Sequence, residues 1–276
     1  MKLAFSINLS SILLSKSSIL ENLISFGSFS NYIKSRRRTL NFLKEAKIDG
    51  IELVASSIVF KRDIEKVKKI LAENNLSVFS VHQPVLKLCR ISLAGIEVLL
   101  ALAAAFSAKV VVLHLFAIGK RLYNPEFVKA LKSLEEKYGV KIGLENGIKD
   151  IFTSLKTYCH EEEKIRKISS LTGLNLTLDT THLAHAGGSI IDFYRQNKEK
   201  IINIHLSDYK NVFFNRFFPS GMHLPLGEGE LPIGEFLKIL KEDNYGGLLT
   251  LEINSGFKGM EKSVQFLQSQ FLSISS

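Results

Sequence analysis

Short apolar segments alternate with longer amphipathic segments along the chain, and this alternation constrains the fold more than any other feature. Each apolar segment is rich in Val, Ile and Leu and is followed by a stretch with helical periodicity, which is typical of parallel β-α-β units. Strands are predicted at residues 3–7, 51–54, 78–82, 110–114, 141–145, 176–179, 201–205 and 248–253. Helices are predicted at residues 39–47, 64–74, 93–106, 125–138, 161–171, 190–198, 233–243 and 259–271.

These strand-helix pairs predict an α/β fold, a closed (β/α)8 TIM barrel. The length of 276 residues suits one such barrel, which typically has roughly 250 residues. We therefore expect residues 1–276 to form a single domain. An open doubly wound sheet is the alternative, but its Gly-x-Gly-x-x-Gly dinucleotide fingerprint does not occur in the sequence.

The composition argues against a disulfide scaffold and a membrane protein. Cys89 and Cys159 are the only cysteines, and they do not form a Cys-x-x-Cys pair, so a reducing cytoplasm is the expected location. The most apolar stretch, residues 93–116, contains Glu97 and Lys109 and reads as a buried helix followed by a buried strand. No membrane span and no export signal is expected.

The chain is basic, with a formal net charge of +9 and a pI of about 9.4. Its densest basic cluster is Arg36 to Arg38. Such a charge favours polyanionic partners, but lysines spread over amphipathic helices more often form a solvated surface. DNA binding is therefore possible but disfavoured, and any such binding is expected to weaken steeply as salt rises.

Polar side chains close most of the predicted strands. In a TIM barrel the carboxyl ends of the strands form the active site. A single histidine after an apolar strand is more often a hydrogen-bonded core residue than a ligand. Here three of the seven histidines and three carboxylates occupy such positions, namely His82, His114, Glu145, Asp179, His205 and Glu252.

These residue types predict a metal centre. Three carboxylates buried side by side repel one another, and a divalent cation removes that cost. We therefore predict metal ligation by Glu145, Asp179, His205 and Glu252. Carboxylate and imidazole ligands suit Mn, Zn, Mg, Fe or Co. His82 and His114, listed above, indicate either a second metal or substrate contacts at the same mouth.

Further candidates lie in the loops after the strands. His182 follows Asp179 by three residues and can reach back over the site, whereas His185 has a weaker claim and fits packing or capping equally well. The loop 221–232 carries His223, followed by Pro225, Gly227 and Gly229, which indicate an ordered turn over the barrel mouth. The remaining candidates for substrate contact are Asn146 and Asp208.

The ordered set of motifs "LENG", "LDTTH", "IHLSD", "HLPLGEGEL" and "LTLEIN" covers nearly the whole chain. It resembles the xylose-isomerase-like barrel superfamily, which includes sugar isomerases, ketose epimerases and the apurinic/apyrimidinic endonuclease called endonuclease IV. The motifs are specific for the superfamily and much less so for one reaction.

The resemblance to the isomerases and epimerases implies one divalent metal held by residues matching Glu145, Asp179, His205 and Glu252. It implies that Glu145 and Glu252 remove and return a proton through an enediolate, and that His182 binds a substrate hydroxyl. One position departs from the ketose epimerases, which have an arginine six residues after the strand-seven histidine, where this chain has Asn211.

The resemblance to endonuclease IV implies a different mapping. His82 and His114 would hold one zinc with Glu145 bridging, and Asp179, His205 and Glu252 would complete a second. His182 and His223 would share a third zinc with an aspartate two residues before His223. Three departures count against it. Gly221 stands in place of that aspartate, Val85 and Leu86 stand where an aromatic wedge is expected, and "ENGIKD" replaces a loop of small residues.

The sequence therefore favours a metal-dependent sugar or sugar phosphate isomerase or epimerase. The alternative is a zinc phosphodiesterase acting on abasic DNA or another phosphodiester. A barrel that only binds a sugar is disfavoured because the four predicted ligands are present. The aromatic loop at residues 211–220 could be a substrate lid, a contact in a homo-oligomer, or part of a small core.

Overall fold

The fold is given by a computed structural model. It describes residues 2–8, 36–46, 48, 50–55, 61–84, 91–148, 162–212 and 221–273, with side chains excluded at 7–8, 36–40, 61–63 and 271–273.

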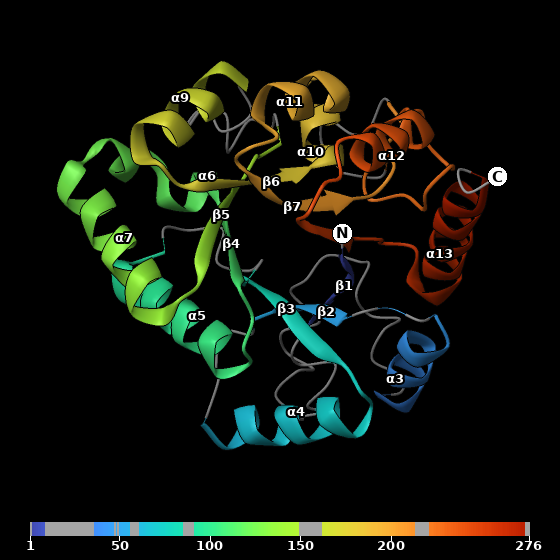
Figure 1. The fold of residues 1–276 in the computed structure, drawn as a ribbon, viewed down its shortest axis with the longest axis horizontal. Coiled ribbons are helices and arrows are strands. Elements are labelled where there is room, and N and C mark those ends of the chain that lie inside the picture. Colours follow the sequence, from blue (N-terminus) through green and yellow to red (C-terminus); the bar gives the residue numbers. More distant parts are fainter. Residues whose placement is uncertain are drawn as a thin grey trace.

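Eight parallel strands close into a barrel at the centre of the molecule (Figure 1). Each strand pairs with its neighbours in chain order, and β1 pairs with β8 to close the ring. The strands are β1 (Lys2–Asn8), β2 (Gly50–Val54), β3 (Ser77–His82), β4 (Val110–His114), β5 (Lys141–Glu145), β6 (Asn175–Asp179), β7 (Ile201–Leu206) and β8 (Leu248–Leu251). The barrel predicted from the sequence is therefore confirmed.

An outer ring of helices surrounds the strands in chain order (Figure 1). Its members are α3 (Arg36–Glu45), α4 (Lys61–Glu73), α5 (Leu93–Ala105), α7 (Pro125–Tyr138), α9 (Glu162–Thr172), α11 (Ile190–Asn197), α12 (Ile233–Glu242) and α13 (Gly256–Ser273). Among the described residues, no helix combines the length and the apolar character needed to cross a bilayer.

Three short helical segments were not predicted. Helix α6 (Leu115–Ile118) and the 3₁₀ helix η2 (Gly119–Tyr123) follow β4, and α10 (Thr180–His185) follows β6. Segments of four to six residues are too short to show helical periodicity in the sequence. Strand β8 also ends at Leu251, earlier than predicted, so that Glu252 lies just beyond the strand.

Local signals explain where the helices begin and end. The Asn124 side chain accepts hydrogen bonds from the Glu126 and Phe127 N–H groups at 2.9 and 3.3 Å, and Pro125 occupies the first turn of α7. Gly139 ends this helix with φ of 63°, a left-handed conformation that glycine adopts without strain. Pro232 lies at the N-cap of α12, directly before its first turn.

The core fills the space between the strands and the helix ring. Strands β2 and β4 are buried along their whole length, as expected for strands covered on both sides. On the outer side, Phe236 of α12 packs edge-on against Tyr194 of α11 with ring centroids 5.6 Å apart. Phe236 is fully buried, so its ring contributes to stability mainly through burial and close packing.

We expect Phe236→Ala to lower the free energy of unfolding by about 3–5 kcal/mol, because it removes a buried ring and leaves a cavity. Urea denaturation followed by circular dichroism measures this change. Lys238→Ala on the same helix is the control, because the Lys238 side chain is 66% exposed, and it should change stability by less than about 0.5 kcal/mol. Equal effects of the two substitutions would contradict the described packing.

Candidate active site

Four acidic and imidazole side chains meet at the carboxyl end of the barrel. Glu145 and Asp179 are the last residues of β5 and β6, His205 is next to last in β7, and Glu252 directly follows β8. One ligand atom from each lies within 4.8 Å of the others. The structure thus brings together all four residues that the sequence predicts as metal ligands.

Three polar atoms of this group are buried and, within the described part of the chain, form no hydrogen bond: Asp179 Oδ2, His205 Nδ1 and Glu252 Oε2. His205 Nδ1 lies 3.0 Å from Glu252 Oε2, 3.4 Å from Glu145 Oε1 and 3.9 Å from Asp179 Oδ2. Buried polar atoms without partners are costly. Carboxylate oxygens and one imidazole nitrogen at these distances fit a divalent cation.

Asp179 shows how the local fold prepares one ligand atom. It is the N-cap of α10, and its Oδ1 accepts hydrogen bonds from the His182 N–H at 2.7 Å and the Thr181 hydroxyl at 3.0 Å. The Asn146 side chain bonds both the N–H and the C=O of Asp179, at 2.8 and 3.0 Å. One carboxylate oxygen is thereby used in the helix cap, and Oδ2 remains for the site.

The contacts of Asn146 bear on its predicted role. The sequence marks it as a candidate for substrate contact, but its amide donates to and accepts from the Asp179 backbone. It is buried. In the structure, Asn146 therefore holds β6 beside β5 instead of presenting its amide to the barrel mouth.

The sequence reasoning missed Glu52, a fully buried carboxylate in the middle of β2. Its Oε2 accepts hydrogen bonds from the Ser80 hydroxyl at 2.8 Å and the Asn203 amide at 3.1 Å, and it lies 3.2 Å from His205 Nε2. Burial alone would raise the pKa of Glu52, but His205 lowers it. The position of this glutamate inside the apolar segment "GIELV" is the sequence feature that could have indicated a buried polar role.

Glu52 and the metal-ligand candidates approach His205 from opposite sides of its ring. Nε2 faces Glu52, and Nδ1 faces Glu145 and Glu252. A carboxylate that accepts the Nε2 proton leaves a lone pair on Nδ1 and fixes the orientation of the imidazole. This arrangement is typical of histidines that bind a metal.

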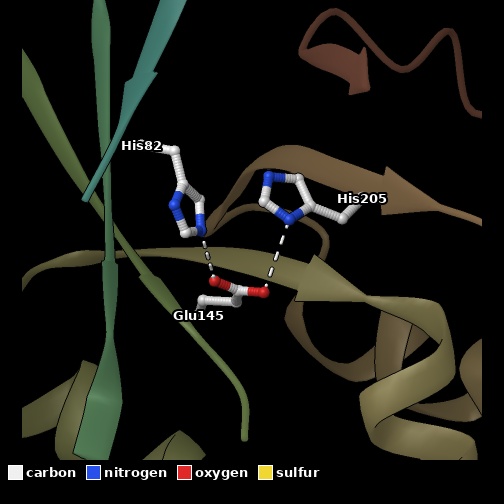
Figure 2. Close-up of side chains that lie close together, drawn as sticks. All are labelled: His82, Glu145 and His205. Atoms are coloured by element: carbon white, nitrogen blue, oxygen red, sulfur yellow. Dashed lines mark hydrogen bonds and ion pairs between the residues drawn. The ribbon is translucent and has the colours of Figure 1, made fainter. Parts of the chain in front are cut away.

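His82 and His114 both contact Glu145, as the sequence predicts for residues of one site. Their Nε2 atoms lie 3.1 and 3.0 Å from Glu145 Oε2. Figure 2 shows the Glu145 carboxylate between His82 and His205, with one imidazole directed at each oxygen. Glu145 is thus surrounded by imidazoles and is itself only 1% exposed.

His182 and His223 lie on the other side of the site. Their rings are 5.3 Å apart in an edge-on contact, and one ligand atom from each lies within 4.8 Å of Asp179. His182 Nδ1 also lies 3.3 Å from Glu145 Oε1. His223 has a φ of 53°, which is uncommon for a residue with a side chain.

Asp208 holds the loop that carries His223. Its carboxylate accepts hydrogen bonds from four backbone N–H groups, and its backbone pairs with that of Leu224. The four donors are Tyr209, Gly227, Gly229 and Leu231. The sequence marks Asp208 as a candidate for substrate contact, and the structure uses it as a loop anchor. His185, another such candidate, packs edge-on against Tyr209 with ring centroids 6.3 Å apart.

The pKa values reflect the mutual burial of these groups. Burial alone would raise the pKa of Glu145, but the imidazoles of His114, His205 and His182 hold it well below its usual range. Burial alone would lower the pKa of His182, but Asp179 and Glu145 raise it to about 10. Without a metal, protons on imidazoles offset the carboxylate charge. A bound cation would take over that role.

A cleft lies at the opposite end of the barrel. This cleft of about 1000 Å³ is lined by the amino-terminal ends of several strands, with Lys2, Lys68, Lys109 and Phe79 at its wall. Its described lining contains no carboxylate and no imidazole. This cleft therefore lacks the carboxylates and imidazoles that meet at the carboxyl end.

Several predicted features fall outside the described residues. These are Val85 and Leu86, Cys89 and Cys159, residues 149–150 of the "ENGIKD" loop, and residues 213–220 of the aromatic loop. The side chains of Arg36 to Arg38 are also not described.

Metal-free protein is expected to lose stability as the pH rises from 6.5 to about 10. The pKa of His182 is about 10 in the folded chain and 6.5 ordinarily. Its contribution to stability is therefore complete below pH 6.5 and is lost as the pH rises through about 10. Thermal midpoints in the presence of chelator measure this loss. His182→Gln should flatten the decline, and an unchanged slope would contradict the assignment.

Comparison with family models matches residues 40–270 to a family described as "Xylose isomerase-like TIM barrel". An uncharacterized protein of Mycobacterium tuberculosis is 25% identical over 230 residues, which cover 75% of this chain and 80% of that protein. An inosose dehydratase of Clostridium botulinum is 26% identical over 148 residues, about half of each chain, 49% of both.

Solved structures with the same fold span almost the whole chain. A "D-tagatose 3-epimerase-like protein" has a TM-score of 0.69 at 21% identity and covers 100% of this chain and 98% of its own. The IolI protein, solved with a zinc atom, has a TM-score of 0.66 at 15% identity and covers 99% of this chain and 98% of its own. At these identities the likeness shows the fold.

Proposed function

The chain belongs to the xylose isomerase-like TIM barrel family, and on that premise we propose that it is a metal-dependent sugar or sugar phosphate isomerase or epimerase. Glu145, Asp179, His205 and Glu252 would hold one divalent cation. The observation that carries the proposal is this four-residue group, in which three buried ligand atoms have no hydrogen bond within the described residues.

A divalent cation at this site would supply positive charge that lowers the cost of an enediolate. The metal is Mn, Zn, Mg or Co, all of which accept carboxylate and imidazole ligands. Support for a metal comes from the donor set, from Glu52 on the far nitrogen of His205, and from the zinc in the IolI structure. The sugar substrate is supported by the epimerase and dehydratase names among the similar proteins.

Glu145 and Glu252 are the residues that move the proton in this proposal. They come from β5 and from the end of β8, which lie well apart in the ring, and their carboxylates meet at His205 Nδ1. One removes a proton from the carbon next to the carbonyl and the other returns it. Both carry a lowered pKa, so both are ionised at neutral pH.

His182 would bind a substrate hydroxyl. It is partly exposed, with 16% of its side chain accessible, and its Nδ1 faces Glu145 and Asp179. His223 stands beside it on the loop anchored by Asp208. These two imidazoles would bind sugar hydroxyls and so position the sugar next to the carboxylates of Glu145 and Glu252.

A zinc phosphodiesterase is the second candidate. It is favoured by Asp179, His182 and His223, whose ligand atoms lie within 4.8 Å of one another and could hold a further cation. Gly221 weighs against it, because this position would have to supply a charged ligand. The two candidates differ in substrate and in the number of metals.

We expect Glu145→Gln and Glu252→Gln each to lower turnover by at least about 10²–10⁴-fold, because each removes a group that transfers a proton. The assay is a panel of ketoses and their phosphates in D2O with Mn2+, in which NMR detects new isomers and deuterium next to the carbonyl.

The control is Glu235→Gln in the first turn of α12, an exposed carboxylate outside the four-residue group, which should leave turnover unchanged. Loss of water from the sugar, detected as a mass change, would indicate a dehydratase instead. Hydrolysis of bis(p-nitrophenyl) phosphate or abasic DNA with no exchange in any sugar would contradict the proposal and favour the phosphodiesterase.

A further inference from the structure

Gln83 is a buried residue directly after β3 that contacts both histidines next to Glu145. It is 1% exposed. Its side chain reaches His114, the last residue of β4, and its backbone carbonyl faces His82. No step of the proposed reaction uses it, although a buried amide in a site of ionisable groups needs defined partners.

The orientation of the Gln83 amide follows from its partners. The backbone N–H of His114 donates to one end of the amide at 3.1 Å, and because that group is always a donor, this end is the oxygen Oε1. The other end, Nε2, lies 2.8 Å from His114 Nδ1. An amide nitrogen can only donate, so His114 Nδ1 must accept.

The tautomer of His114 is fixed by this contact. With a lone pair on Nδ1, the ring proton is on Nε2, and Nε2 lies 3.0 Å from Glu145 Oε2. His114 therefore donates a hydrogen bond to the Glu145 carboxylate. Because His114 contacts only Oε2, the other carboxylate oxygen, Oε1, is left available to a cation. Oε1 lies 3.4 Å from His205 Nδ1.

Gln83 also contacts His82, but through its backbone carbonyl. His82 Nδ1 lies 2.6 Å from the Gln83 carbonyl oxygen, which can only accept, so Nδ1 carries a proton. Its Nε2 forms a hydrogen bond of 3.1 Å with Glu145 Oε2, and because a carboxylate can only accept, Nε2 also carries a proton. Burial alone would lower the pKa of His82, but Glu145 raises it, in agreement with a doubly protonated ring. Gln83 thus treats the two histidines differently, through its carbonyl in one case and its side-chain amide in the other.

The consequence concerns how many metals the site can hold. A neutral imidazole binds a metal through the nitrogen that has the lone pair. In His114 the nitrogen with the lone pair is Nδ1, and it faces Gln83. If His114 bound a metal through Nε2, its proton would be on Nδ1, and this N–H would face the N–H of the Gln83 amide, so that two donors would oppose each other. In agreement, none of the potential metal-binding groups among the described residues includes His114.

We propose that Gln83 is a positioning residue that keeps His114 a hydrogen-bond donor to Glu145 and so prevents a second metal from binding between His82, His114 and Glu145. The inference rests on the proposed metal centre at Glu145, Asp179, His205 and Glu252. It adds a residue that excludes a cation from the space between His82, His114 and Glu145.

The variant that tests the inference is Gln83→Glu. A carboxylate at position 83 can accept hydrogen bonds from both the backbone N–H and the Nδ1–H of His114. The lone pair of the ring is then on Nε2, where it can bind a metal. Metal-binding histidines usually have such a carboxylate on their other nitrogen. With excess Zn2+, native mass spectrometry should show one more zinc per chain than in the unaltered protein. The double variant Gln83→Glu/His114→Ala should lose that additional zinc.

A measurement on the unaltered protein keeps the inference testable if Gln83→Glu does not fold. Long-range ¹⁵N–¹H correlation spectra of the histidines should show His114 protonated at Nε2 and not at Nδ1. Protonation at Nδ1 would overturn the inference. So would a folded Gln83→Glu variant that binds no additional zinc, or an unaltered protein whose second zinc is lost in His114→Ala.

These outcomes separate the inference from the proposed function. A protein that binds one zinc and has the expected His114 tautomer, but converts no sugar, would overturn the isomerase proposal alone. A protein that converts sugars but carries the proton on His114 Nδ1 would overturn the inference alone.

Discussion

The repulsion between buried carboxylates at one end of the barrel is the constraint on which the rest of the site depends. Glu145, Asp179 and Glu252 converge on a single imidazole nitrogen of His205, and Glu52 lies behind the same ring. Charges of one sign in a low dielectric raise one another's free energy, so the group persists only with compensating cations. In the metal-free chain that compensation is protons on imidazoles, which explains the raised pKa values of His182 and His205. A divalent cation would replace those protons, and the proposed chemistry follows from that exchange.

The barrel supplies the geometry for this cluster. Strand ends place the ligands, while neighbouring polar side chains fix their orientation: Asn146 holds the backbone of Asp179, Glu52 holds the far nitrogen of His205, and Asp208 holds the loop of His223. Each of these contacts uses a buried polar group that would otherwise need a partner. Because the supporting residues are separate from the four converging side chains, loop changes would alter the substrate-facing surface without altering the proposed metal centre.

The sequence predicted the barrel and the convergence of Glu145, Asp179, His205 and Glu252 because strand periodicity and chemical type are local properties. Glu145, Asp179 and His205 each terminate an apolar segment, and the closed topology brings such ends together. The roles of Asn146 and Asp208 could not be predicted, because a polar residue in a loop looks the same whether it faces substrate or backbone. Glu52 was missed because its partners, Ser80, Asn203 and His205, come from strands far apart in the chain. The protonation states around Gln83 depend on contacts across two strands and were likewise invisible in the sequence.

Anomalous diffraction from crystals grown with Mn2+ and measured near the manganese absorption edge tests the central claim most directly. The account predicts one strong peak per chain, coordinated by Glu145, Asp179, His205 and Glu252, with His114 still donating to Glu145. A principal peak between His82, His114 and Glu145, or no peak at all at the carboxyl end of the barrel, would contradict it.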